Sequence, residues 1–156
     1  MLYVFDTNSL RILSNYYPKR FPTFWQQFEA SIIKQEVASA KEVLHELEVQ
    51  LTDTWFLEWC KAHRALFRTP TPAETTTVAK IFAVPHFQAL VGEKQRLRGS
   101  HVADPFIIAC ASVNTGCVVT EEAHRANGAK IPNVCDHFGI KWTNVEGFLE
   151  AKGWEF

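Results

Sequence analysis

Carboxylates follow two apolar segments that have the character of buried strands. Asp6 comes directly after the apolar residues 2–5, and Glu121 and Glu122 come directly after the sequence CVVT at 117–120. In open parallel sheets, ligands bind beyond the carboxyl ends of the strands, at the point where the strand order reverses. We therefore expect these side chains to lie along one edge of a sheet.

Further acids could reach the same edge from helices. Asp104 opens the apolar sequence DPFIIACAS, whose proline in the second position suits the first turn of a helix. That helix would lead into the strand at 117–120. Glu42 and Glu46 are four residues apart, so they share one face near the start of a helix. Acids that are far apart in the sequence could thus converge on one rim of the fold.

Several carboxylates held close together repel one another unless a cation lies between them. Carboxylate oxygens are ligands that suit Mg²⁺ or Mn²⁺, and such a metal can activate water and stabilise the charge of an in-line phosphodiester displacement. Each acid also has a simpler interpretation. Asp6 and Asp104 could each cap the start of a helix. Glu42, Glu46 and Glu48 could form a solvated helix face.

Apolar periodicity and capping residues predict the elements that would hold these acids. Ser39 is a predicted N-cap, and Thr52 and Asp53 are predicted to open the next helix. The predicted helices span residues 8–15, 21–34, 39–51, 52–66, 73–91 with an interruption at Pro85, 104–112, 131–138 and 144–152. The predicted strands span residues 2–5, 36–39, 117–120 and 139–143. Strands that alternate with helices indicate an α/β fold with parallel pairing and right-handed crossovers.

The composition indicates an ordinary globular protein. The chain has 156 residues, of which 47% are hydrophobic, and no repeat or linker divides it, so we expect a single domain over residues 1–156. The 16 basic and 17 acidic side chains give a formal charge of -1, which neither favours nor excludes nucleic-acid binding. The four cysteines lack the spacing of zinc ligands, and we find no signal peptide or membrane span. We expect a cytoplasmic protein with reduced cysteines.

Four segments, taken in order, resemble the PIN-domain family of nucleases. They are VFDTN at the amino terminus, EVLHELE, ADPFIIACA and CVVTEE. The closing segment KIPNVCDHFGIKW resembles one bacterial branch of PIN-like proteins that is catalogued as a domain of unknown function. The resemblance spans nearly the whole chain, with residues 52–91 the least specific. It implies a three-layer α/β/α PIN-like fold with a central, mostly parallel sheet of four to five strands.

The resemblance implies that four acids form a catalytic metal site. Asp6 matches the first metal-binding acid of the family, Glu46 matches its glutamate and Asp104 matches its third acid. Glu122 takes the place of a fourth acid that is most often aspartate. The additional methylene of a glutamate would shift the metal or make its contact water-mediated.

Two of these assignments leave a choice between neighbouring glutamates. Glu42 competes with Glu46 for the second position, and Glu121 competes with Glu122 for the fourth. The sequence alone leaves both choices open.

Other polar residues would support the site. Thr7 or Asn8 matches the small polar residue that helps to order the site in the family, and Thr120 matches the hydroxyl of its fourth strand. A basic stretch before Asp104 could hold RNA phosphate beside the metal, or could be a solvated loop. The residues of this stretch that we consider for RNA binding are Lys94, Arg96, Arg98 and His101.

The resemblance also implies an activity and partners. Members of the family are usually Mg²⁺- or Mn²⁺-dependent ribonucleases, and many small bacterial members are toxins of toxin–antitoxin pairs. It therefore implies an endoribonuclease that acts on RNA, forms homodimers and binds an antitoxin protein.

Other functions remain to be compared with this one. A phosphatase of the haloacid-dehalogenase type needs a second aspartate where this chain has Asn8. A response-regulator receiver needs an arrangement of acids that the chain does not supply. A non-catalytic PIN-like module that binds RNA or protein, and a DNA-directed nuclease of the same fold, both stay open.

Overall fold

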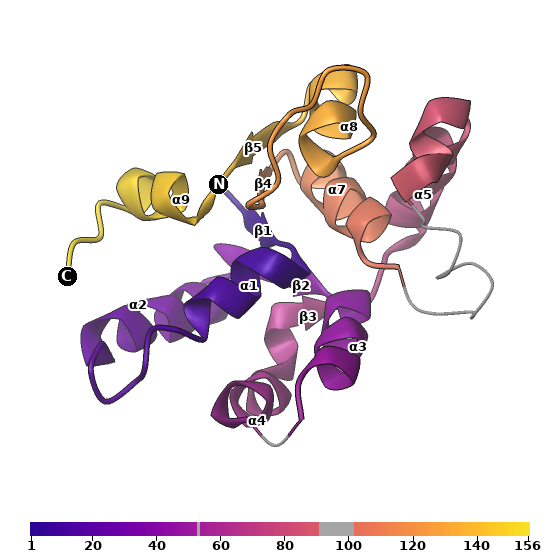
Figure 1. Cartoon of the computed structure of the whole chain (residues 1–156). Helices are drawn as coiled ribbons and strands as arrows, with labels where there is room; N and C mark the ends of the chain where they lie inside the picture. Colours follow the sequence, from indigo (N-terminus) through magenta and orange to yellow (C-terminus); the bar gives the residue numbers. More distant parts are fainter. Residues whose placement is uncertain (53, 91–101) are drawn as a thin grey trace.

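A parallel sheet forms the centre of the molecule. The computed structural model describes residues 1–52, 54–90 and 102–156. Within them, five strands pair in the order β3-β2-β1-β4-β5, and every pairing is parallel (Figure 1). The strands are β1 (Tyr3–Phe5), β2 (Val37–Ala40), β3 (Phe67–Arg68), β4 (Cys117–Val119) and β5 (Lys141–Thr143). The predicted α/β class, with a parallel sheet of four to five strands, is confirmed.

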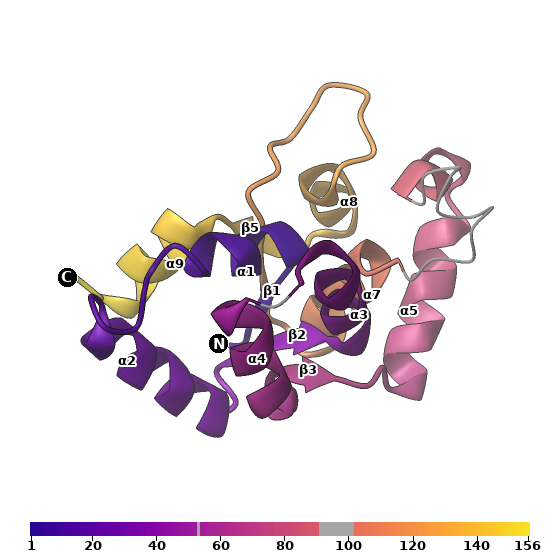
Figure 2. The same cartoon turned by 60° about the horizontal axis from the view of Figure 1, so that its bottom comes forward.

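Helices cover both faces of this sheet. The views in Figures 1 and 2 agree that α2 and α9 lie on one side of the sheet and that α7 and α5 lie on the other. The α-helices are α1 (Thr7–Leu13), α2 (Pro22–Ile33), α3 (Lys41–Gln50), α4 (Trp55–Ala62), α5 (Pro72–Phe82), α7 (Asp104–Val113), α8 (Ile131–Phe138) and α9 (Val145–Lys152). Two 3₁₀ helices, η1 (Arg64–Leu66) and η2 (Pro85–Leu90), connect them. No helix in the described ranges has the length and apolar character that crossing a membrane requires.

The alternation of side chains along β1 explains the two layers of core. Phe5 packs edge-on against Phe28 of α2 and Phe148 of α9, with ring centroids 5.6 and 5.0 Å apart. Successive strand residues point to opposite faces, so the buried Val4 belongs to the other face, where α7 packs against β1, β2 and β4. The apolar sequence of α7 suits this position, because α5 covers α7 in turn.

The strand order places β1 beside the point where the chain changes direction across the sheet. The chain runs from β1 outward through β2 to β3, and it then returns to add β4 and β5 on the other side of β1. Phe5 is in register with Val119, so the residues that follow them, Asp6 and Thr120, leave the sheet at the same level. Ligands bind at such a switch point in open parallel sheets.

The structure corrects the predicted start of the helix that carries Glu46. Ser39 does not cap it, because Ser39 lies in β2 and its hydroxyl donates to the carbonyl oxygen of Phe5 at 2.7 Å. Ala40 takes the N-cap position of α3 and makes no side-chain hydrogen bond there. The serine instead ties β2 to the end of β1.

Two further predictions differ from the structure. The helix predicted at 52–66 begins only at Trp55, because Thr54 caps α4 by accepting a hydrogen bond from the backbone nitrogen of Leu57 at 3.2 Å. The helix predicted at 73–91 ends at Phe82, and Pro85 starts a 3₁₀ helix, as its missing N–H favours. The edge strand β3 was not predicted.

Candidate active site

Asp6 is held from two sides at the carboxyl end of β1. Its Oδ1 accepts a hydrogen bond from the backbone nitrogen of Ser9 at 2.8 Å, and its Oδ2 accepts one from the hydroxyl of Thr120 at 2.6 Å. Burial raises the pKa of Asp6 above its ordinary value, while both of these hydrogen bonds act to lower it. Asp6 therefore caps α1 with one oxygen, as the simpler interpretation proposed, and connects to the end of β4 with the other.

Thr120 connects Asp6 to Glu122. The side chain of Thr120 is fully buried directly after β4. Its hydroxyl oxygen accepts a hydrogen bond from the backbone nitrogen of Glu122 at 3.2 Å while its proton is donated to Asp6. One hydroxyl thus fixes both an acidic side chain and the start of the loop that carries another acid.

Glu46 connects the beginnings of two helices that bear on the site. Its Oε2 accepts a hydrogen bond from the hydroxyl of Thr7, the first residue of α1, and its Oε1 accepts one from the backbone nitrogen of Ala103 at 3.2 Å. Ala103 directly precedes the first residue of α7. Glu42 lies one turn earlier on α3, and its buried Oε2 has no hydrogen-bond partner within the described part of the chain. Of the two competing glutamates, Glu46 is the one that contacts the neighbours of the other acids.

Asp104 lies where the acids meet. It is the first residue of α7, while the residue before it occupies the N-cap position, so Asp104 is not the cap that one interpretation of the sequence made it. Burial, together with the negative charges of Glu122, Asp6 and Glu46, raises the pKa of Asp104 to about 8. Three of the acids that the resemblance singled out therefore act electrostatically on the fourth, Asp104.

The adjacent glutamates after β4 have different surroundings. Oε2 of Glu122 accepts a hydrogen bond from the backbone nitrogen of Ile131, the first residue of α8, at 2.8 Å. Oε1 of Glu121 accepts one from the backbone nitrogen of Val145, the first residue of α9, also at 2.8 Å. Both side chains satisfy a helix N-terminus, but Glu122 is the one whose charge acts on Asp104.

The structure distinguishes between the two candidates for the small polar residue beside the acids. Thr7 is buried against Glu46, whereas Asn8 is exposed on α1, so Thr7 is the neighbour that contacts an acid. The predicted RNA-binding residues Lys94, Arg96, Arg98 and His101 lie outside the described residues.

Sequence reasoning missed one cation beside the acids. The positive charge of Lys130 lowers the pKa of Asp104, in opposition to the three carboxylates. Lys130 directly precedes α8, at the start of the segment KIPN. The only available signal was its place in that closing segment, because a single lysine in a polar loop carries no spacing pattern.

The donor chemistry of the acids fits a divalent cation of the Mg²⁺ or Mn²⁺ class, which prefers carboxylate oxygens. A cation would also relieve the repulsion that raises the pKa of Asp104. As placed, Glu46 and Glu122 direct their oxygens to protein donors. Over residues 1–52, 54–90 and 102–156, no three His, Cys, Asp or Glu side chains are grouped closely enough to hold one ion. Binding would therefore require some of these carboxylates to turn from their present partners.

The chain matches a family model and is similar to solved structures. Residues 3–156 match the model of a family described as "Domain of unknown function (DUF4411)". The chain is also similar to a structure described as the crystal structure of VapBC2 from Rickettsia felis bound to a DNA fragment from their promoter, with 14% identity and a TM-score of 0.49. That similarity covers 92% of this chain and 98% of the other. No curated protein matches the chain.

Proposed function

The chain belongs to the family described as Domain of unknown function (DUF4411), and we propose that it is a PIN-like, metal-dependent endoribonuclease. The four motif segments that resemble PIN nucleases each contribute one acid, and the fold has the parallel sheet that such a resemblance implies. Hydrolysis of a phosphodiester is the chemistry that best uses such a group of carboxylates.

The electrostatic effect of three other acids on Asp104 is the observation that carries this proposal. Asp6, Glu46 and Glu122 come from three separate segments, yet their charges together act on Asp104, whose pKa is raised to about 8. A group of mutually repelling carboxylates at the switch point of a sheet is costly to the fold. Such clusters are characteristic of functional sites.

The supporting residues would keep the acids ordered and charged. The hydroxyl of Thr120 and the backbone nitrogen of Ser9 donate to Asp6 and favour its ionised form. Glu46 holds the backbone immediately before Asp104 through Ala103, so it would act as a positioning residue for α7. These contacts fix the site from the strand side and from the helix side.

The metal would be held by Asp6, Asp104 and Glu122, with Glu46 beside them. When bound, Mg²⁺ or Mn²⁺ would supply the positive charge that activates water and stabilises the charge developing on the phosphate. The chain's own part would be to orient the carboxylates, and Asp104 would release its proton to solvent as the cation binds.

Cleavage of RNA by the purified protein tests the proposal. Mixed RNA and single-stranded DNA are incubated with Mn²⁺, Mg²⁺ or EDTA, beside Asp6→Asn, Asp104→Asn and the control Glu48→Gln, whose side chain is exposed on α3. We expect metal-dependent cutting of RNA by the wild type and the control, and none by the two aspartate variants. Equal cutting by either aspartate variant would overturn the assignment of the site. Cutting of DNA but not of RNA would show that the protein is a DNA-directed nuclease.

One observation favours a non-catalytic PIN-like module as the second candidate. Glu46 and Glu122 are both engaged with backbone nitrogens, in contacts that also make sense as purely structural ones. Such a module would bind RNA or protein without cutting it. Titration with Mn²⁺ separates the two candidates, since a structural role for the acids predicts no metal binding that depends on Asp6.

We also propose that the nuclease is the toxin of a toxin–antitoxin pair, acting in the cytoplasm as a homodimer that an antitoxin protein inhibits. The resemblance to small bacterial PIN-like proteins supports this part. Expression in a bacterial host tests it, because a toxin should arrest growth while Asp6→Asn should not. Normal growth with active, soluble wild-type protein would count against the toxin role.

A further inference from the structure

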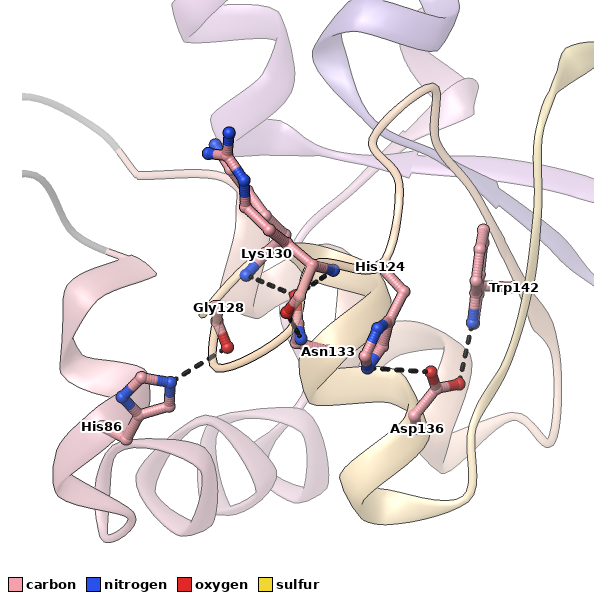
Figure 3. Close-up of polar contacts among 8 residues, drawn as sticks. His86, His124, Gly128, Lys130, Asn133, Asp136 and Trp142 are labelled. Carbon is pink, nitrogen blue, oxygen red and sulfur yellow. Dashed lines mark hydrogen bonds and ion pairs between the residues drawn. The ribbon is translucent and has the colours of Figure 1, made fainter.

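The loop between β4 and α8 is held in one shape by a single side chain. Oδ1 of Asn133, a nearly buried residue of α8, accepts hydrogen bonds from the backbone nitrogens of Arg125 and Lys130 at 3.3 and 3.2 Å. Its Nδ2 donates to the carbonyl oxygen of Arg125 at 2.6 Å. Figure 3 shows Asn133 beneath the loop, close to Lys130 and Gly128. The backbone positions of two cations are therefore set by α8.

A second contact ties the same loop to η2. His86 of η2 donates from Nε2 to the carbonyl oxygen of Gly128 at 2.9 Å (Figure 3). A cleft of about 550 Å³ lies between η2, the loop and α8, and its lining includes His86, Phe87, His124 and His137. That volume is within the ~300–1,000 Å³ of typical small-molecule sites. The loop thus forms one wall of a cavity that is large enough to take an organic ligand.

The lining of this cleft has the chemistry that recognises a nucleobase. The exposed ring of His137 meets the buried ring of Phe87 edge-on, with centroids 5.1 Å apart, so Phe87 supports an imidazole that remains available for stacking. Asn127 adds an exposed amide group to the lining, and amides form hydrogen bonds with base edges. Few of these groups are apolar enough to attract an aliphatic ligand.

Asp136 brings one negative charge to the cleft, but its two oxygens have partners. Oδ1 accepts a hydrogen bond from Nε1 of Trp142 at 2.9 Å, and Oδ2 is 3.7 Å from Nε2 of His124 (Figure 3). These contacts orient His124 at the boundary of the cleft and reduce the effect of the carboxylate on a bound anion.

A second hollow shares His124 with the cleft and is lined by Glu122, one of the acids. This hollow has a volume of about 340 Å³, and Glu122, His124, Arg125 and Lys130 are among its lining residues. His124 lines both cavities, and Lys130 lines the second one together with Glu122. Arg125 and Lys130 therefore lie between the acidic centre and the histidine-lined cleft, at the place where a nucleic-acid backbone leaving the acids would need positive charge.

We propose that this track binds single-stranded RNA next to the phosphate that is cut. Arg125 and Lys130 bind backbone phosphates, and the cleft that includes His137 and Phe87 takes the base of the neighbouring nucleotide. The strand is single, because only an unpaired base can leave its stack and enter a cleft. This inference rests on the proposed ribonuclease function and names the part of the surface that holds its substrate.

Binding measured without cleavage tests the track. Fluorescence anisotropy of a labelled, mixed-sequence single-stranded RNA is followed in EDTA with the wild type, Arg125→Ala, His137→Ala and the control Arg20→Ala. All three altered side chains are exposed, and Arg20 lies in the α1–α2 connection, far from α8 in both views (Figures 1 and 2). The contact of Arg125 with Asn133 uses backbone atoms, so its truncation keeps the loop in place.

A second probe separates the base from the phosphates. An abasic ribose-phosphate oligomer of the same length carries the charges of the RNA but no bases. We expect His137→Ala to raise the Kd for RNA by about fivefold or more and to leave the Kd for the abasic oligomer unchanged. Arg125→Ala should raise both Kd values, and Arg20→Ala neither.

The outcomes also distinguish this inference from the proposed function. If the wild type does not bind RNA, or if Arg125→Ala and His137→Ala bind it as the wild type does, the track is wrong even where RNA is cut. If His137→Ala raised the Kd for RNA and the Kd for the abasic oligomer by the same factor, the base site would likewise be wrong. If the variants behave as expected but no metal supports cutting, the track stands and the nuclease proposal falls.

Discussion

The hydroxyl of Thr120 donates to Oδ2 of Asp6 over 2.6 Å, and the two residues are 114 positions apart in the chain. Both directly follow a strand, and their strands β4 and β1 are in register. The contact is buried, so the carboxylate exchanges no hydrogen bond with water on that side. This hydrogen bond allows a direct test of whether the fold orients Asp6 for metal binding.

Replacement of Thr120 by valine should weaken divalent-metal binding. The change keeps the shape of the side chain but removes the donor to Asp6 and the acceptor for the backbone nitrogen of Glu122. We expect a loss of about 10–100-fold in Mn²⁺ affinity, as for other residues that orient metal ligands, measured by calorimetric titration. Thr120→Ser should retain most of the affinity, and Thr76→Val, which alters an exposed helix hydroxyl, should retain all of it. Wild-type affinity in Thr120→Val would show that this hydroxyl does not support a metal site.

Replacement of Asp104 by asparagine should stabilise the metal-free protein at high pH. The pKa of Asp104 is raised from 3.8 to about 8, so the folded protein keeps a proton that the unfolded chain releases in this interval. The corresponding stability is present below the lower value and is lost as the pH rises to the upper one. In EDTA, Asp104→Asn should exceed the wild type by about 1–3 kcal/mol near pH ~9 and by little near pH ~5 in urea unfolding. If the free energy of unfolding changed with pH in the same way for both proteins, the raised pKa of Asp104 would be contradicted.

Glu46 and Glu42 should differ sharply when each is changed to glutamine. Glu46→Gln removes a charge from the cluster and weakens the contacts with Thr7 and Ala103, so we expect cleavage to fall by at least about tenfold. Glu42→Gln should leave cleavage within about twofold, because its buried Oε2 has no partner in the described residues to lose. Initial rates of RNA cleavage at saturating Mn²⁺ compare the pair. A larger loss of cleavage rate in Glu42→Gln than in Glu46→Gln would assign the site position to Glu42 instead of Glu46.

Glu122 and Glu121 offer a second matched pair. In Glu122→Gln the amide oxygen can still accept from the backbone nitrogen of Ile131, but the negative charge that acts on Asp104 is gone. We expect Glu122→Gln to lose metal-dependent cleavage with little change in melting temperature, and Glu121→Gln to keep both properties. Cleavage rates and thermal unfolding of the same preparations provide the comparison. Retained cleavage in Glu122→Gln would remove Glu122 from the site.

The sequence predicted the elements that carry strong local patterns. The helix over 131–138 has the predicted bounds, α7 begins with Asp104 as expected, and the apolar runs beside Asp6 and before Glu121 are β1 and β4. Such elements are fixed by apolar periodicity, by proline in a first turn and by polar residues at strand ends, all of which are local. Strand β3 has only two residues, and it exists because Phe67 and Arg68 pair with β2, which no local pattern reports.

The sequence selected the members of the candidate site by motif order, and this assignment of Asp6, Glu46, Asp104 and Glu122 stays a prediction. Their contacts could not be predicted from the sequence. The choice of Glu46 over Glu42 depended on where Ala103 lies, a relationship across the fold that helical spacing cannot supply. Lys130 escaped prediction for the same reason, since its effect on Asp104 arises only after α8 has packed beside α7.

The central position of β1 has a consequence for biosynthesis. Strand β1 is flanked on one side by β4, which is translated only after β2, β3 and α7. Until β4 is made, Asp6 lacks the hydroxyl of Thr120, and the nascent chain cannot close its sheet around the acids. Whatever chemistry the acids support should therefore require β4, and a nascent chain that ends before Thr120 should lack it.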